Sequence, residues 1–308
     1  MRDASPRGIP HSRSPALVLR YRPRHRTDGT ELLMATAEAP MVLASRAPRT
    51  RRTTRKALLG ATGILGFLVT WQLIPTLGIV DPRFLPYATD TLARLVAEAL
   101  DLEFWRNIGR TMTAWTIGLA IASLAALVLG TIIGLIPFLR RATHSTVEFL
   151  RPIPSVALIP LAILLFGFQL PAALVIIVYA TFWQVFVQVL YGVADIDTVA
   201  RDTARSYGLT GRAQVFSLVL PTALPYVMTG LRLGAAVALI LAITAELTIG
   251  VPGIGREIVF AQGASDFTLV YALVIVTGLI GLVVNMGFRL IERRALSWHQ
   301  SVRGEETS

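Results

Sequence analysis

Long apolar runs divide most of the chain into segments that can cross a membrane. The hydrocarbon core of a bilayer is about 30 Å thick, and a helix needs about 20 apolar residues to span it. Five uncharged runs fit this requirement, and a sixth segment fits it with two charges inside. The expected spans are residues 57–80, 111–139, 152–169, 171–193, 221–248 and 268–288. The pattern predicts an all-α polytopic membrane protein with six transmembrane helices.

Shorter patterns add detail to this layout. Residues 90–102 carry an apolar stripe at helical spacing and predict a linker helix that lies along the membrane interface. Three prolines within residues 152–160 predict that the third span is kinked or irregular at its start. The second span has a small residue every fourth position, which lets another helix approach closely, either in the same chain or in a second subunit. These residues are Gly118, Ala122, Ala126, Gly130 and Gly134.

Composition agrees with a membrane location. Hydrophobic residues make up 54% of the chain and charged residues 16%, and the mean hydropathy is +0.61, which excludes an ordinary soluble protein. Of the net charge of +10, +9 lies in residues 1–56, so the rest of the chain is nearly neutral; only the tail has the charge to bind nucleic acid, and no nucleic-acid partner is expected. That tail, rich in Arg, Pro, Ser and Thr, is expected to be disordered and cytoplasmic. There is no cysteine, and the four histidines lack ligand spacing, so no metal site is expected.

The basic residues also orient the chain. Arg and Lys gather before the first span, between spans two and three, between spans four and five, and after the sixth. Because cytoplasmic loops carry such an excess, both termini, including the tail at 296–308, are expected in the cytoplasm. The polar segment between spans four and five, at about residues 195–221, is then cytoplasmic as well.

This polar segment has helix signals of its own. Asp195 and Asp197 are suited to cap a helix, Gly208 to end it, and Thr210 to cap a second short helix. Pro221 and Pro225 would then bend the chain into the fifth span. On composition alone the segment is equally well an amphipathic elbow at the membrane interface.

The same residues resemble a known motif. The cytoplasmic EAA loop of bacterial ABC-importer permeases has Glu-Ala-Ala, three residues, Gly, nine residues, and then Ile, any residue, Leu-Pro. Here the pattern is Asp202-Thr203-Ala204, three residues, Gly208, nine residues, and Leu218-Val219-Leu220-Pro221. The chain departs from the motif at two positions, with Asp202 in place of Glu and Thr203 in place of the first Ala. The stretches at 149–160, 245–247 and 293–299 are similar to the nitrate, sulfonate and taurine branch of these permeases.

The resemblance implies a permease subunit of a type I importer in a bacterial cell membrane. It implies a homodimer that works with separate ATPase subunits and an extracytoplasmic solute-binding protein, and a small anionic solute of the sulfonate, nitrate or taurine kind. Residues 202–204, Gly208, Leu218, Leu220 and Pro221 would couple the permease to the ATPase. The chain lacks Gly-x-x-x-x-Gly-Lys-Ser/Thr, so ATP would be bound by the partner, and neither a cofactor nor catalysis is expected in this chain.

Four polar residues within the spans are candidates for the solute path. Arg232 and Glu246 are thirteen residues apart on one helix, about 20 Å, so at least one lies within the apolar core of the bilayer. Ionisable groups at that depth are usually functional or paired. Glu246 is a candidate gate residue, and Arg232 either meets an anionic solute or reaches towards the interface. Gln184 and Gln188 either line the pore or bond neighbouring helices.

Two other classes of membrane protein compete with this interpretation. A secondary active transporter also has kinked helices and charges at membrane depth, but it would normally show more spans and internal repeats. A polytopic membrane enzyme would need a catalytic cluster, such as paired acids or a nucleophile beside a base. The sequence shows neither feature.

Overall fold

The computed structural model describes residues 50–209 and 211–296, and its residues from Ala57 onward belong to one compact unit. Every element among the described residues is helical. The elements are α1 (Thr50–Thr76), α2 (Ala88–Glu98), α3 (Leu102–Leu135), α4 (Pro137–Leu150), the 3-10 turn η1 (Ser155–Leu158), α5 (Ile159–Phe166), α6 (Leu170–Ala194), α7 (Thr198–Ser206), α8 (Gly211–Gln214), the π-helix η2 (Val215–Val219), α9 (Leu220–Ile249), α10 (Ile254–Gly263) and α11 (Phe267–Ala295).

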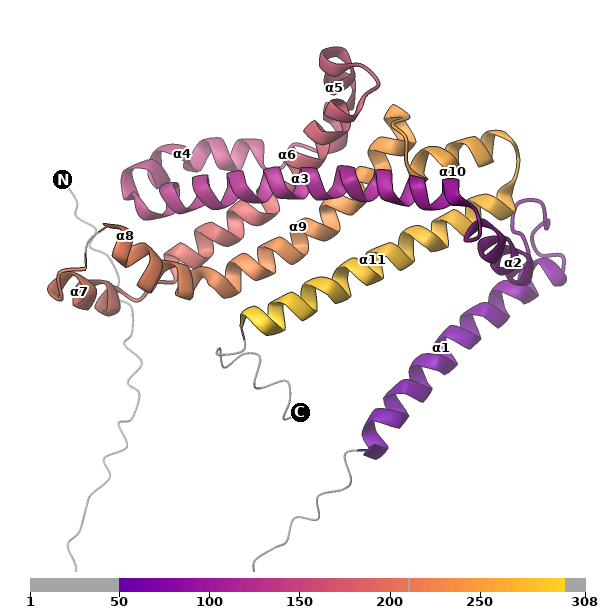
Figure 1. Cartoon of the computed structure of the whole chain (residues 1–308), viewed down its shortest axis with the longest axis horizontal. Coiled ribbons are helices and arrows are strands. Elements are labelled where there is room, and N and C mark those ends of the chain that lie inside the picture. The colour runs from indigo at the N-terminus through magenta and orange to yellow at the C-terminus, as the bar shows by residue number, and fades with distance from the viewer. Residues whose placement is uncertain (1–49, 210, 297–308) are drawn as a thin grey trace, which may run out of the picture. The chain divides into compact units, whose positions relative to one another are not determined.

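The core of this unit is a bundle of α3, α6 and α9, which lie side by side in Figure 1. The small residues of α3 face α6: Ala122 and Ala126 are fully buried, and a methyl group added at Gly130 would come within 2.8 Å of Val189. Gly118 meets Ile177 in the same way. The strip therefore packs within the chain, the first of the two alternatives that its spacing left open.

Glycines also bring α6 and α9 together. A methyl group at Gly192 of α6 would lie 2.9 Å from Ala223, and one at Gly230 of α9 would lie 2.9 Å from Gln188. Gly234 of α9 lies against Val185 at 3.0 Å by the same measure. Because these contacts leave little space between the helices, α6 and α9 are expected to move as one body.

Five of the helices are long and apolar enough to cross a membrane, and a sixth crossing depends on a bent pair. The pair is Pro137–Leu150 with Ser155–Phe166, which meet at 82°. α5 has eight residues, about 12 Å, which is too short to span the bilayer alone. The irregular start predicted from the prolines is present, since Pro154 precedes the 3-10 turn and Pro160 lies in the first turn of α5.

Three boundaries differ from the sequence-based expectations. Residues 140–151 were expected to be a loop between the second and third spans, but residues 137–150 form α4, with Pro137 in the first turn. α3 begins at Leu102 rather than Thr111, because the Asp101 side chain caps it by accepting a bond from the Glu103 N–H. α1 begins at Thr50 rather than Ala57. Of the predicted tails at 1–56 and 296–308, residues 1–49 and 297–308 lie outside the described residues.

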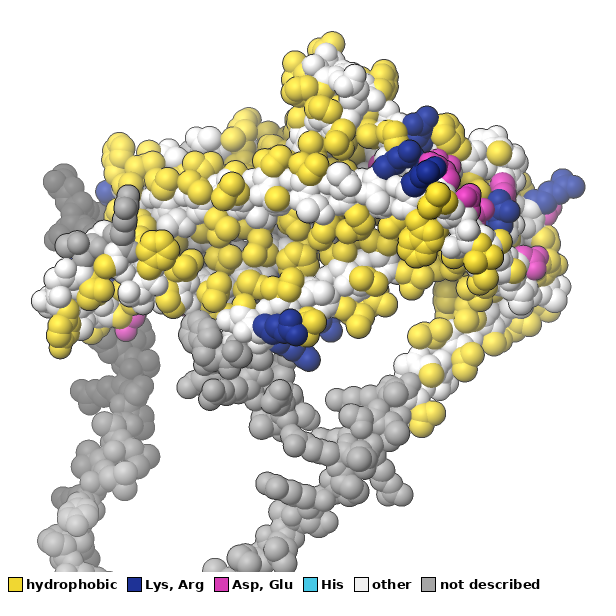
Figure 2. Space-filling model, in the orientation of Figure 1, with side chains coloured by type: hydrophobic (Ala, Val, Ile, Leu, Met, Phe, Trp, Pro, Cys, Tyr) yellow, Lys and Arg dark blue, Asp and Glu magenta, His cyan; other side chains and the backbone are white. Residues whose placement is uncertain are grey.

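α1 and α11 are the least covered of the long helices. Only 11% of the apolar window of α1 and 17% of that of α11 is buried. Figure 2 shows hydrophobic side chains covering the helices, with charged ones gathered over α2, α10 and the start of α3 and near the end of α11. This distribution suits helices that contact lipid along their length and water at their ends.

Candidate functional site

The first part of the candidate site is α7, which is fixed at both ends by local signals. At its start the Asp197 side chain accepts a hydrogen bond from the Val199 N–H at 2.8 Å. At its end Gly208 has a φ of +77°, the left-handed conformation that favours glycine. The Leu209 N–H bonds to the Ala204 carbonyl and the Gly208 N–H to the Arg205 carbonyl, which together form a Schellman motif. Gly208 thus ends the helix, as its position predicts.

Asp195 has a different role from the cap expected for it. It follows the last residue of α6, and its carboxylate accepts a hydrogen bond from the Tyr226 hydroxyl at 2.9 Å. Since Tyr226 belongs to the first turns of α9, this bond ties the end of α6 to the start of α9. Thr210 lies outside the described residues.

The return from α7 into the membrane is a continuous helical run. α8 leads into the π-helix η2, and η2 leads into α9 without a break. The Leu220 N–H bonds to the Val215 carbonyl, five residues back, so the turn is wider than an α-helical one. Pro221 lies in the first turn of α9, and Pro225 lies further along it. A π turn inside a long helix is a common marker of a functional or mechanically soft position.

The residues of the EAA-like motif lie on this segment with different exposures. Asp202, Thr203 and Gly208 are exposed, and Ala204 is half-buried. The Asp202 carboxylate has one ion-pair contact among the described residues, a long one of 3.7 Å with Arg205 on the same helix. Leu218 lies in η2, while Leu220 and Pro221 begin α9. α7 therefore presents an exposed carboxylate beside small side chains.

Glu246 lies near the other end of α9 and is 2% exposed. Its Oε2 accepts hydrogen bonds from the Gly255 N–H at 2.8 Å and from the Thr111 hydroxyl at 3.0 Å. The Thr111 hydroxyl oxygen in turn accepts a bond from the Ile254 N–H at 3.0 Å. Side chains from α9 and α3 thus satisfy the first N–H groups of α10, whose own Gly253 provides no side-chain cap.

Two glycines make room for this carboxylate. A methyl group at Gly253 would overlap the Glu246 carboxyl group, and one at Gly255 would lie 2.6 Å from the Ile243 carbonyl oxygen. Glu246 Oε1 is buried and has no hydrogen-bond partner among the described residues. We call Glu246, Thr111, Gly253 and Gly255 the α10 clasp. It joins α3, α9 and α10 at one end of the bundle.

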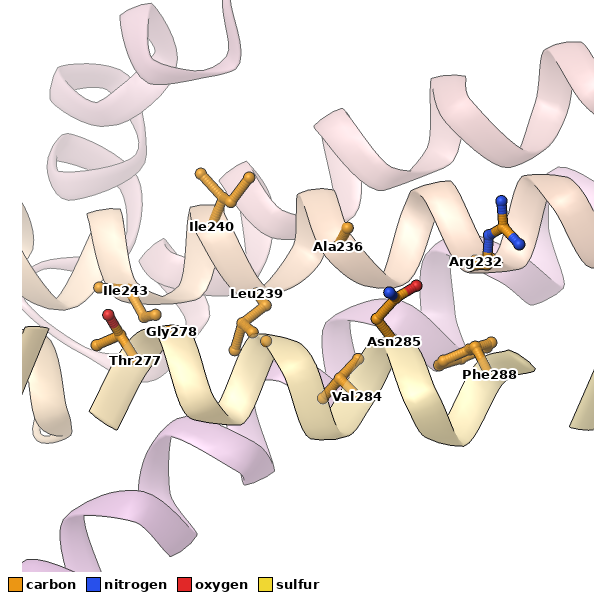
Figure 3. Close-up of a pocket in the computed structure, with 11 residues that line it drawn as sticks. Arg232, Ala236, Leu239, Ile240, Ile243, Thr277, Gly278, Val284, Asn285 and Phe288 are labelled. Atoms are coloured by element: carbon orange, nitrogen blue, oxygen red, sulfur yellow. The ribbon is translucent and has the colours of Figure 1, made fainter. Parts of the chain in front are cut away.

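Arg232 is not near this clasp, and its partner is on α11. Its Nη1 lies 3.1 Å from Oε2 of Glu292, and both side chains are partly exposed. Next to this ion pair, α9 and α11 border a cavity of about 300 Å³. Figure 3 shows Asn285 directed from α11 towards α9 and Arg232 further along α9. The other lining is mostly apolar, with Leu239 and Phe288 among it. An arginine at the end of an apolar cavity is suited to hold an anionic group.

The two glutamines of α6 are apart from both charges. Gln184 is exposed, while Gln188 packs its side-chain carbons against Gly230 of α9. The structure therefore does not bring the four candidate path residues into one site. It separates the α10 clasp, the ion pair of Arg232 and the α6 face.

Several site residues were missed at the sequence level. Thr111 and Glu292 are remote in sequence from their partners, by 135 and 60 residues, and no local pattern identifies them. The clasp glycines did leave a signal, the run Gly-Val-Pro-Gly-Ile-Gly at 250–255 directly after the fifth span. Three glycines in six residues at the end of a helix predict a tight backbone approach.

No group of three or more potential metal-ligating side chains occurs in the part of the chain that the structure describes.

Comparison with known proteins agrees with this architecture. A family model described as "Binding-protein-dependent transport system inner membrane component" matches residues 118–297, more than half of the chain. The chain is 29% identical over 258 residues to the taurine transport system permease protein TauC of Escherichia coli, covering 81% of this chain and 93% of that protein. It is 30% identical to the bicarbonate transport system permease protein CmpB of Synechococcus elongatus, covering 77% and 88%.

Two further matches extend the comparison. The putative aliphatic sulfonates transport permease protein SsuC of Escherichia coli is 28% identical, over 79% of this chain and 93% of that protein. Among solved structures, a chain of the MetNI methionine ABC transporter in inward-facing conformations superposes with a TM-score of 0.55 at 18% identity, covering 63% of this chain and 96% of that one. The last match concerns the fold alone. Together the sequence matches favour an importer permease over a secondary transporter or a membrane enzyme.

Proposed function

Since the chain belongs to the family of binding-protein-dependent transport system inner membrane components, we propose that it forms the membrane path of an ATP-driven importer for a small oxyanion. It is a permease, a transport subunit and not itself an enzyme. The solutes named for its relatives are taurine, aliphatic sulfonates and bicarbonate. Each of these carries a sulfonate or carboxylate-like group. The proposal rests on this shared chemistry, because the chain matches each of these relatives over most of that relative's length.

The energy for transport comes, in this proposal, from a separate ATPase that holds α7. Permeases of this family work with ATPase subunits and a binding protein. The chain lacks the glycine-rich phosphate loop and its lysine. α7 is supported as the contact because it is capped at both ends and exposes Asp202 and Thr203. A short rigid helix of this kind transmits displacement better than a loop.

Displacement of α7 would then tilt α9. α8, η2 and α9 form one helical run from Gly211 to Ile249, and the Tyr226–Asp195 bond couples it to α6. We place the permease as a homodimer with both termini in the cytoplasm. Closure of the ATPase would then convert an inward-open path into an outward-open one. At the far end of α9 the α10 clasp would carry the movement into α10, which we assign to the outer gate.

The cavity between α9 and α11 is the candidate for the solute path. It offers one guanidinium, at Arg232, and the amide of Asn285 within mostly apolar walls. A sulfonate or bicarbonate could replace the carboxylate of Glu292 on Arg232, because all of them are oxyanions that accept hydrogen bonds from a guanidinium. The internal ion pair would then keep Arg232 from lying unpaired when the path is empty.

Reconstitution tests the proposal directly. The full-length permease is co-expressed with a candidate ATPase and a candidate binding protein and placed in proteoliposomes. Uptake of radiolabelled taurine, an alkanesulfonate and bicarbonate is measured with internal or external ATP. We expect ATP-dependent uptake of one of them that needs the binding protein and stops with an ATPase variant that cannot hydrolyse ATP. Uptake that follows a proton gradient without ATP would contradict the proposal.

A further inference from the structure

A groove of about 450 Å³ lies between α7, the α8–η2 elbow and the end of α3. Its lining includes Arg201 and Arg205 of α7, Leu135 of α3, and Val215, Phe216 and Val219 of η2. We call it the elbow groove. One side of the groove is charged, because it carries two guanidinium groups, and most of the remaining lining is apolar.

The elbow groove is on the opposite side of α7 from the exposed apolar and small side chains. Successive residues of an α-helix are about 100° apart. Arg201 and Arg205 are one turn apart and therefore lie on one face, while Val199, Thr203 and Ser206 lie on the other. Val199 is 69% exposed. An ATPase that grips the Val199 and Thr203 face therefore leaves the arginine face to the elbow groove.

The arginines of this groove have little negative charge to balance them. Arg205 has one contact with a carboxylate, that of Asp202 at 3.7 Å, and both side chains are largely exposed, so the pair contributes little. Arg201 has no ion pair among the described residues. Gln214, also in the lining, donates its side-chain N–H to the Leu209 carbonyl at 2.7 Å, which fixes the shape of the elbow. The groove is thus a preformed cationic site.

The apolar part of the groove belongs to two membrane spans. Leu135 is the last residue of α3, and Val215 begins the apolar run that continues to Ile249. Because both candidate spans end at the groove, we expect it to lie at the level of the lipid headgroups. Phe216, which is 68% exposed, extends the apolar surface beyond the groove.

We propose that the elbow groove binds an anionic phospholipid. The guanidinium groups of Arg201 and Arg205 hold the lipid phosphate, which suits their bidentate geometry, and an acyl chain follows Leu135 and Phe216 into the bilayer. A free phosphate ion would use the arginines but not the apolar surface. Because the lipid contacts α7 on one side and the elbow on the other, it sets the position of α7 relative to α9. This site goes beyond the transport function and does not depend on which solute is carried.

Lipid binding is measured on the full-length permease alone, by native mass spectrometry after titration with dioctanoyl phosphatidylglycerol, dioctanoyl phosphatidylcholine or inorganic phosphate. The test variant is Arg201→Gln/Arg205→Gln. The matched control is Arg140→Gln/Arg141→Gln, which removes the same charge from exposed positions on α4. We expect phosphatidylglycerol to bind in preference to phosphatidylcholine, the test variant to weaken it roughly 30-fold, and the control to change it less than about threefold.

Two further variants separate lipid binding from the binding of a free anion and guard against misfolding. Phe216→Ala should weaken the binding of phosphatidylglycerol while leaving both arginines in place. Arg201→Lys/Arg205→Lys should retain part of the affinity for phosphatidylglycerol. Equal binding of the two lipids, an equal loss in the control, or inorganic phosphate binding as tightly as phosphatidylglycerol would each overturn the proposal. Unchanged phosphatidylglycerol binding by the Arg201→Gln/Arg205→Gln variant would also overturn it, and loss of co-purification with the ATPase in that variant would then assign the arginines to the ATPase contact.

Discussion

Gly253→Ala is expected to destabilise the junction of α9 and α10 only while Glu246 is present. The added methyl group would overlap the Glu246 carboxyl group. Forcing an extra methyl group into a packed site typically costs about 1–3 kcal/mol. The φ of Gly253 is 163°, which is extended backbone that alanine can adopt, so the cost comes from space and not from conformation.

Glu246→Ala removes the carboxylate and leaves the Gly255 N–H buried without its acceptor. An unsatisfied buried group of this kind costs about 1–3 kcal/mol. In this background the space beside Gly253 is open, so Gly253→Ala should add almost nothing. The double-mutant cycle therefore predicts a coupling energy of about 1–3 kcal/mol between the two positions. Glu246→Gln, which retains an oxygen acceptor for Gly255, should lose less stability than Glu246→Ala.

Thermal unfolding of the full-length protein in detergent, followed by intrinsic fluorescence, measures the cycle. A cost of about 2 kcal/mol corresponds to a fall in Tm of roughly 4–8 °C for a domain of 150–250 residues. Gly263→Ala is the matched control on α10, because no atom lies within 4 Å of the methyl group it would add. If Gly253→Ala lowers the Tm equally with and without Glu246, or no more than Gly263→Ala does, the described contact between Gly253 and Glu246 is not what constrains the site.

Three further predictions concern the packing, the coupling helix and the ion pair. Gly118→Ala should lower stability by about 1–3 kcal/mol in a chemical-denaturation assay, because its methyl group would overlap Ile177, whereas Gly109→Ala on the same helix should not. Gly208→Val should reduce solute uptake more than ATP hydrolysis in proteoliposomes, since a β-branched residue resists a φ of +77° and weakens the end of α7; Gly208→Asn should be milder. Glu292→Gln should lower the apparent KM for an anionic solute by freeing Arg232, and an unchanged or raised KM would contradict that role.

The apolar runs predict five of the helices because length and hydropathy alone decide whether a segment can span a bilayer. For residues 152–169 they predict one continuous span, whereas the structure has two helical segments within residues 137–166 that meet at 82° and form a sixth crossing only if they count as one span. Residue counting gives the amount of apolar chain but not the path of the backbone, and the arginines at 140 and 141 favour a loop as readily as a helix end.

The candidate site was also predictable only in part. The end of α7 at Gly208 was predictable, since a Schellman motif is formed by neighbouring residues. That Glu246 would be paired was also predictable, because a carboxylate in an apolar helix needs a partner. Its partner Thr111 was not, since 135 residues separate them and only the packing of α3 against α9 and α10 brings them together.

The sparse packing of α1 has an evolutionary consequence. Between Leu58 and Thr76 most of its side chains are exposed, apart from contacts such as that of Trp71 with Tyr271 and the Pro86 carbonyl. Selection on such a helix acts on its hydrophobicity and length rather than on the shapes of its side chains. α1 should therefore diverge faster among descendants of this gene than α3, α6 or α9, with Leu, Ile, Val and Phe exchanging freely, and it should be the span most easily replaced by one from another protein.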